Sequence, residues 1–300
     1  MADIVDLCVV RGGHVNAVDR RVLAVTVNCA GGGPEASAAA SRAGMDAWLR
    51  VVLAQPESRW PSLVFAQETR GPWLERWRGA GYHVVTASPR YRPVSAVITR
   101  LEVVGDRPAS IPTQGYHGSY LVGLQVLLPG GTAPLLAVSV HASPRVVDEH
   151  NLEIWDSLAA RPRPRPRVGA GPGAGRLFDA DMVLATLAEC ALQGSVLAAG
   201  NLNEARDWDD SHPGEWGRDF FERAREHGLQ SPLFDLWGEE RTTRFNPRGR
   251  SYQLDHLLAT REVAALVTEA WVDDRWDDTD SRHGLSDHAP VWFALDPAVR

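Results

Sequence analysis

The chain has 300 residues, of which 44% are hydrophobic and 23% are charged, and its formal net charge is −7. This composition is ordinary for a soluble globular protein, and no apolar run approaches the ~20 residues that span a bilayer. The negative net charge does not indicate nucleic-acid binding. It does not exclude such binding either, because carboxylates gathered around a metal ion lower the net charge without repelling a phosphate that meets the metal first. The first twenty residues lack a basic start followed by an apolar stretch, so we expect no secretory signal and a cytoplasmic location.

Hydrophobic periodicity and turn signals divide the first half of the chain into alternating strands and helices. The predicted strands cover residues 22–28, 63–66, 82–87, 94–99, 120–128 and 134–140. The predicted helices cover residues 35–53, 72–78 and 146–159.

The second half continues this alternation. Helices are predicted at 177–192 and 216–227, and strands at 195–199, 251–259, 267–272 and 289–295. Strands in pairs with interspersed helices predict two packed β-sheets covered by helices. Three widely spaced cysteines, Cys8, Cys29 and Cys190, argue against both a disulfide framework and a cysteine-built zinc site.

The segment from Arg161 to Gly175 reads RPRPRPRVGAGPGAG and cannot form regular structure. Its alternating prolines forbid a helix and favour an extended chain, followed by flexible Gly and Ala residues. Because strand–helix units lie on both sides, we interpret 161–175 as a surface loop within one domain that spans 1–300. The Arg-Pro stretch is either an electrostatic guide along a phosphate backbone or a solvated insertion without a role.

Polar residues that could carry chemistry follow or begin the predicted strands. They are Asn28, Glu68, His141, Asn201, Asn203, Asp255, His256, Asp287 and His288. Carboxylate and amide oxygens suit a hard cation such as Mg²⁺, Mn²⁺ or Ca²⁺, and the histidines suit acid–base work or phosphate binding. Neighbours on a strand point to opposite faces, so at most one of Asp255 and His256 faces a given site.

The order of these motifs is more specific than any one of them. The chain contains the segments VNCAGG, FAQETRG, AVSVHASP, AAGNLNEA, QLDHLLA and LSDHAPVWF, in that order. In this it resembles the endonuclease/exonuclease/phosphatase superfamily, the DNase I-like metal-dependent phosphoesterases, from about Val22 to Leu295.

The resemblance implies an α+β fold, a four-layer α/β sandwich. Two mixed, mainly antiparallel sheets would pack face to face with helices on both outer sides. It also implies hydrolysis of phosphodiesters or phosphomonoesters with a bound Mg²⁺ or similar ion, with Glu68 as the main metal ligand, Asn28 beside it and Asp287 adding a contact.

The remaining roles follow from the same resemblance. His288 would act on the phosphate or the attacking water, and His141 would contact the phosphate or assist the leaving group. Asp255 would orient a catalytic histidine, and Asn203 would contact the scissile phosphate. We expect further substrate contacts from two residues near the site, Arg145 and Trp208.

One position departs from the family motif. The motif reads Gly-Asp-x-Asn, whereas this chain has Gly200, Asn201, Leu202 and Asn203. An amide accepts a hydrogen bond but cannot take a proton, and a general base contributes ~10²–10⁴-fold. Three interpretations stay open: an engineered inactive variant, a natural enzyme that uses another base such as His288, and a natural pseudoenzyme that binds without cutting.

We therefore predict a metal-dependent phosphodiesterase of the nuclease kind, acting as a monomer on nucleic acid or another phosphodiester, with Asn201 as the altered catalytic position. No protein partner and no membrane span are expected. The alternatives are a small-molecule or lipid phosphatase or phosphodiesterase, and a non-catalytic phosphate-ligand binding protein on the same scaffold.

Overall fold

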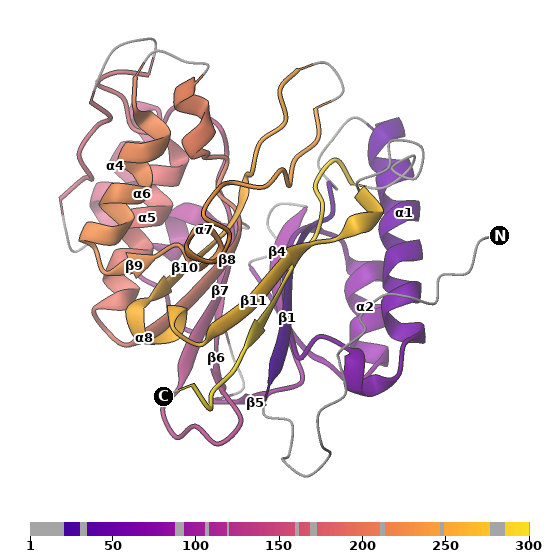
Figure 1. The fold of residues 1–300 in the computed structure, drawn as a ribbon. Helices are drawn as coiled ribbons and strands as arrows, with labels where there is room; N and C mark the ends of the chain where they lie inside the picture. The colour runs from indigo at the N-terminus through magenta and orange to yellow at the C-terminus, as the bar shows by residue number, and fades with distance from the viewer. Residues whose placement is uncertain are drawn as a thin grey trace.

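The computed structural model arranges the chain in four layers, with helices outside and two β-sheets packed face to face between them (Figure 1). It describes residues 21–30, 35–87, 93–105, 108–118, 120–159, 162–168, 173–210, 214–246, 249–276 and 286–299. The predicted α+β sandwich is confirmed.

The first sheet has six strands and is mainly antiparallel. Their order is β11 (Val267–Val272), β12 (Val291–Leu295), β1 (Val22–Asn28), β2 (Leu63–Thr69), β4 (Val94–Thr99) and β3 (His83–Thr86). Of the strand pairs in this sheet, the β1–β2 pair is parallel and the others are antiparallel. The β1 and β2 strands therefore end at the same edge of the sheet.

The second sheet is built in the same manner. Its order is β5 (Glu102–Val103), β6 (Leu121–Leu127), β7 (Leu135–His141), β8 (Ser195–Asn201), β10 (Asp255–Thr260) and β9 (Leu229–Gln230). Here β7 and β8 are parallel, and β10 is antiparallel to β8, so β10 begins where β8 ends.

Helices cover the outer face of each sheet (Figure 1). The first sheet is covered by α1 (Glu35–Ala54) and α2 (Gly71–Gly79), and the second by α5 (Asp179–Ala191) and α6 (Trp216–Glu226), with α4 (Glu149–Leu158) beside them. Short helices complete the connections: α3 (Gln114–His117), α7 (Pro232–Trp237), α8 (Arg261–Ala264), η1 (Glu57–Arg59), η2 (Arg206–Asp210) and η3 (Asp274–Trp276). Within the described residues no helix is long and apolar enough to cross a membrane.

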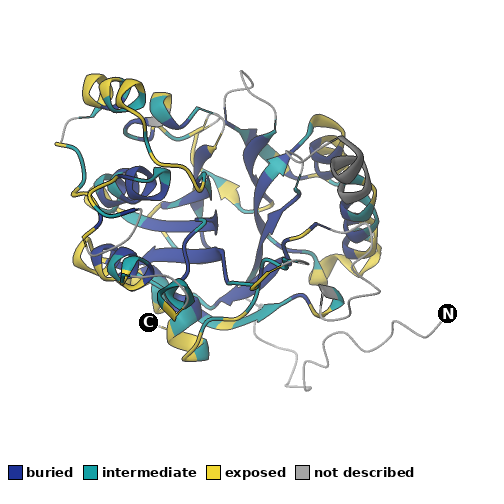
Figure 2. Ribbon diagram, turned by 90° about the horizontal axis from the view of Figure 1, so that it is seen from above, coloured by how far each residue is buried: buried dark blue, intermediate teal, exposed yellow. Residues whose placement is uncertain are grey.

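The main core lies between the two sheets, whose central strands are almost wholly buried while the outer helix faces are exposed (Figure 2). Phe65 of β2 stacks on Phe293 of β12 and packs with Leu124 and Leu197 of the opposite sheet. Because strand residues alternate between faces, each strand also supplies side chains to the core under its helices.

Some element boundaries differ from those predicted. The strand predicted at 63–66 continues to Thr69, and the strand predicted at 251–259 begins only at Asp255. Tyr252 instead pairs with Arg244 in an isolated bridge, which makes the segment before β10 a separate hairpin. The helix predicted at 146–159 begins at Glu149, because the Asp148 side chain accepts a hydrogen bond from the Asn151 amide at its start.

The Arg-Pro stretch has a role that neither interpretation anticipated. Arg163 pairs with Asp156, and Arg165 pairs with Asp219. Arg167 is buried, with 2% of its surface exposed, so the stretch is not a solvated insertion throughout. Arg161 lies outside the described residues.

Candidate active site

Polar residues from both sheets meet at one edge of the sandwich. Asn28 ends β1, His141 ends β7, Asn201 ends β8 and Asp255 begins β10. The register aligns His141 with Asn201, and Asn201 with Asp255, across neighbouring strands. The parallel pairs β1–β2 and β7–β8 thus bring residues far apart in sequence to the same edge.

Glu68 is placed by a β-bulge. The pairing of β2 with β4 shifts register between Ala66 and Thr69, which inserts one extra residue into β2. Glu68 there has a φ of 51°, in the left-handed region that residues other than Gly seldom adopt. Gln67 follows the alternation of Leu63 and Phe65 and contacts the opposite sheet, whereas the bulge lets the next residue, Glu68, reach the strand-end cluster.

Asn28 and His141 flank the Glu68 carboxylate. Asn28 Nδ2 donates to Glu68 Oε1 at 3.3 Å, and His141 Nε2 lies 3.5 Å from the same oxygen. The Asn28 Oδ1 atom accepts a hydrogen bond from the Ala30 amide at 2.9 Å. In this arrangement Asn28 orients the carboxylate, and its role as a metal ligand remains a prediction.

Asp255 and His288 form a buried pair beside this carboxylate. His288 Nδ1 donates to Asp255 Oδ2 at 2.8 Å, and the Thr243 hydroxyl donates to the same oxygen at 2.8 Å. His256 points away from this pair, and its Nε2 donates to the Glu204 carbonyl at 2.8 Å. The expectation that only one of Asp255 and His256 faces the site is therefore met.

Asn201 and Asn203 form a tight turn after β8. The Asn203 amide donates to Asn201 Oδ1 at 2.8 Å, and Asn203 Nδ2 donates to the Ala142 carbonyl at 2.6 Å. Asn203 has a φ of 50°. One N–H of its side-chain amide thus braces the residue that follows β7.

Gly200 is required by this packing. A Cβ atom at Gly200 would lie 2.0 Å from the Val140 carbonyl oxygen and 2.8 Å from Gln67 Nε2, and the residue has a φ of 147°. Only Gly permits so close an approach of β8 to β7 and β2.

Several residues beneath and around the site were not predicted. Gln67 Nε2 donates to Ser139 Oγ at 3.0 Å, which ties the two sheets together below the cluster. The Ser286 hydroxyl donates to the Asn28 carbonyl at 2.7 Å and accepts a hydrogen bond from the His288 amide at 3.1 Å. Ser286 belongs to the LSDHAPVWF segment, so the motif could have identified it, whereas Gln67 and Ser139 carry no sequence signal beyond being polar in a strand.

The other predicted residues lie around the cluster. Asp287 is 46% exposed at its side chain and pairs with Arg244, whose Nε is 3.5 Å from Asp287 Oδ2. Arg145 is exposed, and within the described part of the chain its guanidinium forms no hydrogen bond or ion pair. Trp208 lies on η2 with its ring edge against Tyr252, 6.0 Å between centroids.

The two histidines of the cluster have opposite electrostatic environments. Burial lowers the pKa of His141 below its usual value. Burial acts in the same direction on His288, but the charge and hydrogen bond of Asp255 outweigh it and raise the pKa of His288. The charge of His288 in turn outweighs burial and lowers the pKa of Asp255. The site therefore favours the neutral form of His141 and the charged form of His288. Two neighbouring groups whose pKa values are shifted in opposite directions are typical of acid–base catalysis.

The donor set fits a hard cation that keeps much of its water shell. Among the described residues no three or more His, Cys, Asp or Glu side chains are grouped to hold a metal ion. Mg²⁺ is often bound by one or two carboxylates together with water and substrate phosphate. Glu68 can supply one such carboxylate, while Asp287 as a further ligand remains a prediction.

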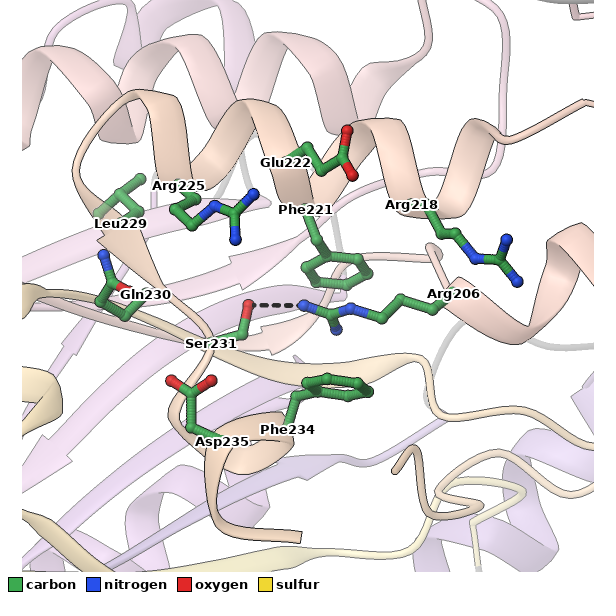
Figure 3. A pocket seen from close by; sticks show the side chains of 10 residues that line it. All are labelled: Arg206, Arg218, Phe221, Glu222, Arg225, Leu229, Gln230, Ser231, Phe234 and Asp235. Atoms are coloured by element: carbon green, nitrogen blue, oxygen red, sulfur yellow. Dashed lines mark hydrogen bonds between the residues drawn. The ribbon is translucent and has the colours of Figure 1, made fainter. Parts of the chain in front are cut away.

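The described part of the structure contains two notable cavities, of which one borders the cluster. One of about 320 Å³ opens beside Glu68 and is walled by Trp73, Arg42 and Arg70. The other, of about 330 Å³, lies between α6 and α7, where the Arg206 guanidinium is held between the rings of Phe221 and Phe234 (Figure 3). No predicted site residue lines the second cavity.

The sequence of the chain is similar to that of a known family. The model of the endonuclease/exonuclease/phosphatase family matches residues 25–288. The chain belongs to this family. No curated protein matches the chain closely enough to count as a relative.

Several solved structures have the same fold as this chain, although their sequences are at most 16% identical to it. The 3′ phosphatase NExo from Neisseria, bound to a product DNA hairpin, is 15% identical with a TM-score of 0.61, covering 92% of this chain and 99% of that one. An AP endonuclease from Archaeoglobus fulgidus is 14% identical with a TM-score of 0.61, with the same coverage of 92% and 99%. TDP2 from D. rerio, complexed with a single-strand DNA product, is 14% identical with a TM-score of 0.56, covering 93% and 100%.

Proposed function

We propose that the chain is a divalent-metal-dependent hydrolase of phosphodiester bonds that acts on nucleic acid. The observation that carries this proposal is the meeting of Glu68, His141 and the Asp255–His288 pair at one edge of the two sheets. The family comprises endonucleases, exonucleases and phosphatases. Solved proteins of the same fold include two that hold DNA products, which favours nucleic acid as the substrate class.

Each residue has a distinct part in the proposed reaction. Glu68 would hold the metal ion, and Asn28 orients the Glu68 carboxylate. A bound Mg²⁺ would polarise a phosphoryl oxygen and offset the negative charge that develops there. The charged His288, held by Asp255, stabilises the same phosphoryl group, and the second amide N–H of Asn203 binds a phosphate oxygen.

Asn201 is the position that limits this chemistry. Its side-chain oxygen accepts the hydrogen bond that shapes the turn, and an amide cannot take a proton from water. His141 is a candidate base, because its Nε2 lies 3.5 Å from Glu68 Oε1 and burial lowers its pKa, which favours the neutral form. Asn201 also supports a second candidate function, a protein that binds a phosphate ester on this scaffold and does not cut it.

A comparison of the chain with its Asn201→Asp variant tests both candidates. Each protein is assayed with Mg²⁺ and with Mn²⁺ on single- and double-stranded DNA, RNA, bis(p-nitrophenyl) phosphate and nucleoside monophosphates. We expect both to cleave DNA or RNA, and the Asp form to be faster by about 10²–10⁴-fold. Two proteins that bind DNA but leave every substrate intact would contradict hydrolysis and support the binding protein.

A further inference from the structure

Arg167 leaves the Arg-Pro stretch and enters the protein interior. Its Nε donates to Asp181 Oδ2 at 3.2 Å, and its Nη1 donates to Glu204 Oε2 at 3.2 Å. Its Nη2 donates to the other oxygen of Glu204, so the guanidinium grips that carboxylate with both terminal nitrogens. The guanidinium also lies 4.1 Å from the centre of the Phe178 ring.

The ions around Arg167 form one buried network. Asp181 Oδ1 accepts a hydrogen bond from Arg223 Nη2 at 2.6 Å, and Arg223 Nε donates to Asp219 at 2.8 Å. The side chains of Arg167, Asp181, Glu204 and Arg223 are each no more than 4% exposed. Buried ions hold a fixed geometry only while every partner is present, because an unpaired buried charge is strongly unfavourable.

Glu204 connects this network to the active site. It follows Asn203, whose left-handed backbone is braced by Asn201 and by the Ala142 carbonyl. The Glu204 carbonyl accepts from His256, and its carboxylate is held by Arg167. The turn that presents Asn203 is therefore anchored on its outer side by a residue that lies 37 positions before Glu204 in the sequence.

We propose that Arg167 is a positioning residue for Asn203, acting through the side chain of Glu204. This rests on the proposed function, in which Asn203 binds the scissile phosphate. The Arg-Pro stretch then contributes to the rate of the reaction and not to the capture of the substrate. A displacement of about 1 Å in a positioned group can cost as much as 10²-fold in rate.

Arg163 offers a matched control. It lies in the same stretch and pairs with Asp156 at 2.7 Å, but this pair is at the surface, with side chains 35% and 49% exposed. It shares no partner with Arg167 among the described residues. Arg163→Met thus removes the same charge and side-chain type without touching the turn at Asn203.

The test measures kcat and KM with bis(p-nitrophenyl) phosphate and Mg²⁺, in the full chain and in its Asn201→Asp form. We expect Arg167→Met to lower kcat at least about tenfold with KM changed less than about threefold, and Arg163→Met to change neither. The double variant Arg167→Met/Glu204→Met removes both charges of the Arg167–Glu204 pair, while Asp181 keeps its hydrogen bond from Arg223. It should regain thermal stability, since replacing a buried pair by apolar residues is often neutral, and yet stay slow because the side chain at position 204 is no longer held by hydrogen bonds.

The outcomes separate this inference from the proposed function. If the parent is active and the double variant folds and turns over like it, Arg167 has only a structural role and the inference fails alone. A kcat of Arg167→Met equal to that of the parent has the same meaning. A parent inert on this substrate in both the Asn201 and the Asp form overturns the proposed function and the inference together.

Discussion

Asp255 accepts hydrogen bonds from His288 and from Thr243 on one and the same oxygen, Oδ2, each at 2.8 Å. Its side chain is 2% exposed and that of His288 is 7% exposed. The carboxylate therefore fixes both the orientation and the charge of the imidazole, and its own geometry is fixed in turn by Thr243.

Replacement of Asp255 by Asn should separate these two effects. Asn keeps the shape of the side chain but removes the charge that raises the pKa of His288, so we expect kcat on the best nucleic acid substrate to fall by about 10²–10⁴-fold. Circular dichroism checks that the fold persists. Glu269→Gln, a surface carboxylate paired with Arg21, is the control and should keep full activity. An Asp255→Asn protein with unchanged kcat would remove Asp255 from the site.

Glu68→Gln should weaken metal binding. The amide keeps the size of the side chain but lacks the charge of the main carboxylate proposed for the ion, so we expect the Kd for Mn²⁺, measured by calorimetry, to rise by at least about tenfold. EDTA should abolish activity of the unmodified chain, and Mg²⁺ or Mn²⁺ should restore it. Glu75→Gln is the matched control, because the Glu75 carboxylate lies on the exposed face of α2. Equal Mn²⁺ affinity in Glu68→Gln would move the metal site elsewhere.

Gly200→Ala should destabilise the fold. The added Cβ would stand 2.0 Å from the Val140 carbonyl oxygen, so β8 must move away from β7. We expect a loss of at least about 2 kcal/mol in the free energy of unfolding, measured by urea titration. Gly194 lies just before the same strand, and nothing lies within 4 Å of a Cβ placed there. Gly194→Ala should be nearly neutral, and equal losses in the two variants would contradict this packing argument.

Stability should fall as the pH is lowered below about 6.5. His117 is buried and 2.8 Å from the Thr186 hydroxyl, and burial lowers its pKa to about 3. The unfolded chain binds a proton near pH 6.5 while folded His117 stays neutral, so the contribution to stability is complete above that pH and is lost as the pH falls towards 3. Urea titrations from pH 7 to pH 4 should show this loss, and His117→Asn should make the slope shallower. An unchanged slope in the variant would assign the effect to other groups.

The layers of the fold could be predicted because each strand repeats a two-residue alternation and each helix an apolar stripe. The strand-end residues Asn28, His141 and Asn201 could be predicted for the same reason, since they stand where the apolar pattern stops. Their meeting depends on strand order, which local patterns do not encode, and it was available only through the resemblance to a family.

Other parts of the site had no local signal. The contact of Thr243 with Asp255 depends on the hairpin before β10, where the apolar pattern predicted a longer strand. Arg244 reaches Asp287 through the same hairpin. Arg167 was predicted to be at the surface with its neighbours, because a run of Arg and Pro gives no indication that one guanidinium meets two buried carboxylates.

The left-handed backbone at Glu68 and Asn203 has a consequence for redesign of this protein. Such a conformation costs roughly 1 kcal/mol for a residue with a Cβ atom. Gly at either position would relieve that cost, and a procedure that optimises stability alone would choose it. The same change would remove the carboxylate or the amide from the site. At these two positions a substitution that stabilises the fold would therefore cost the protein an active-site side chain.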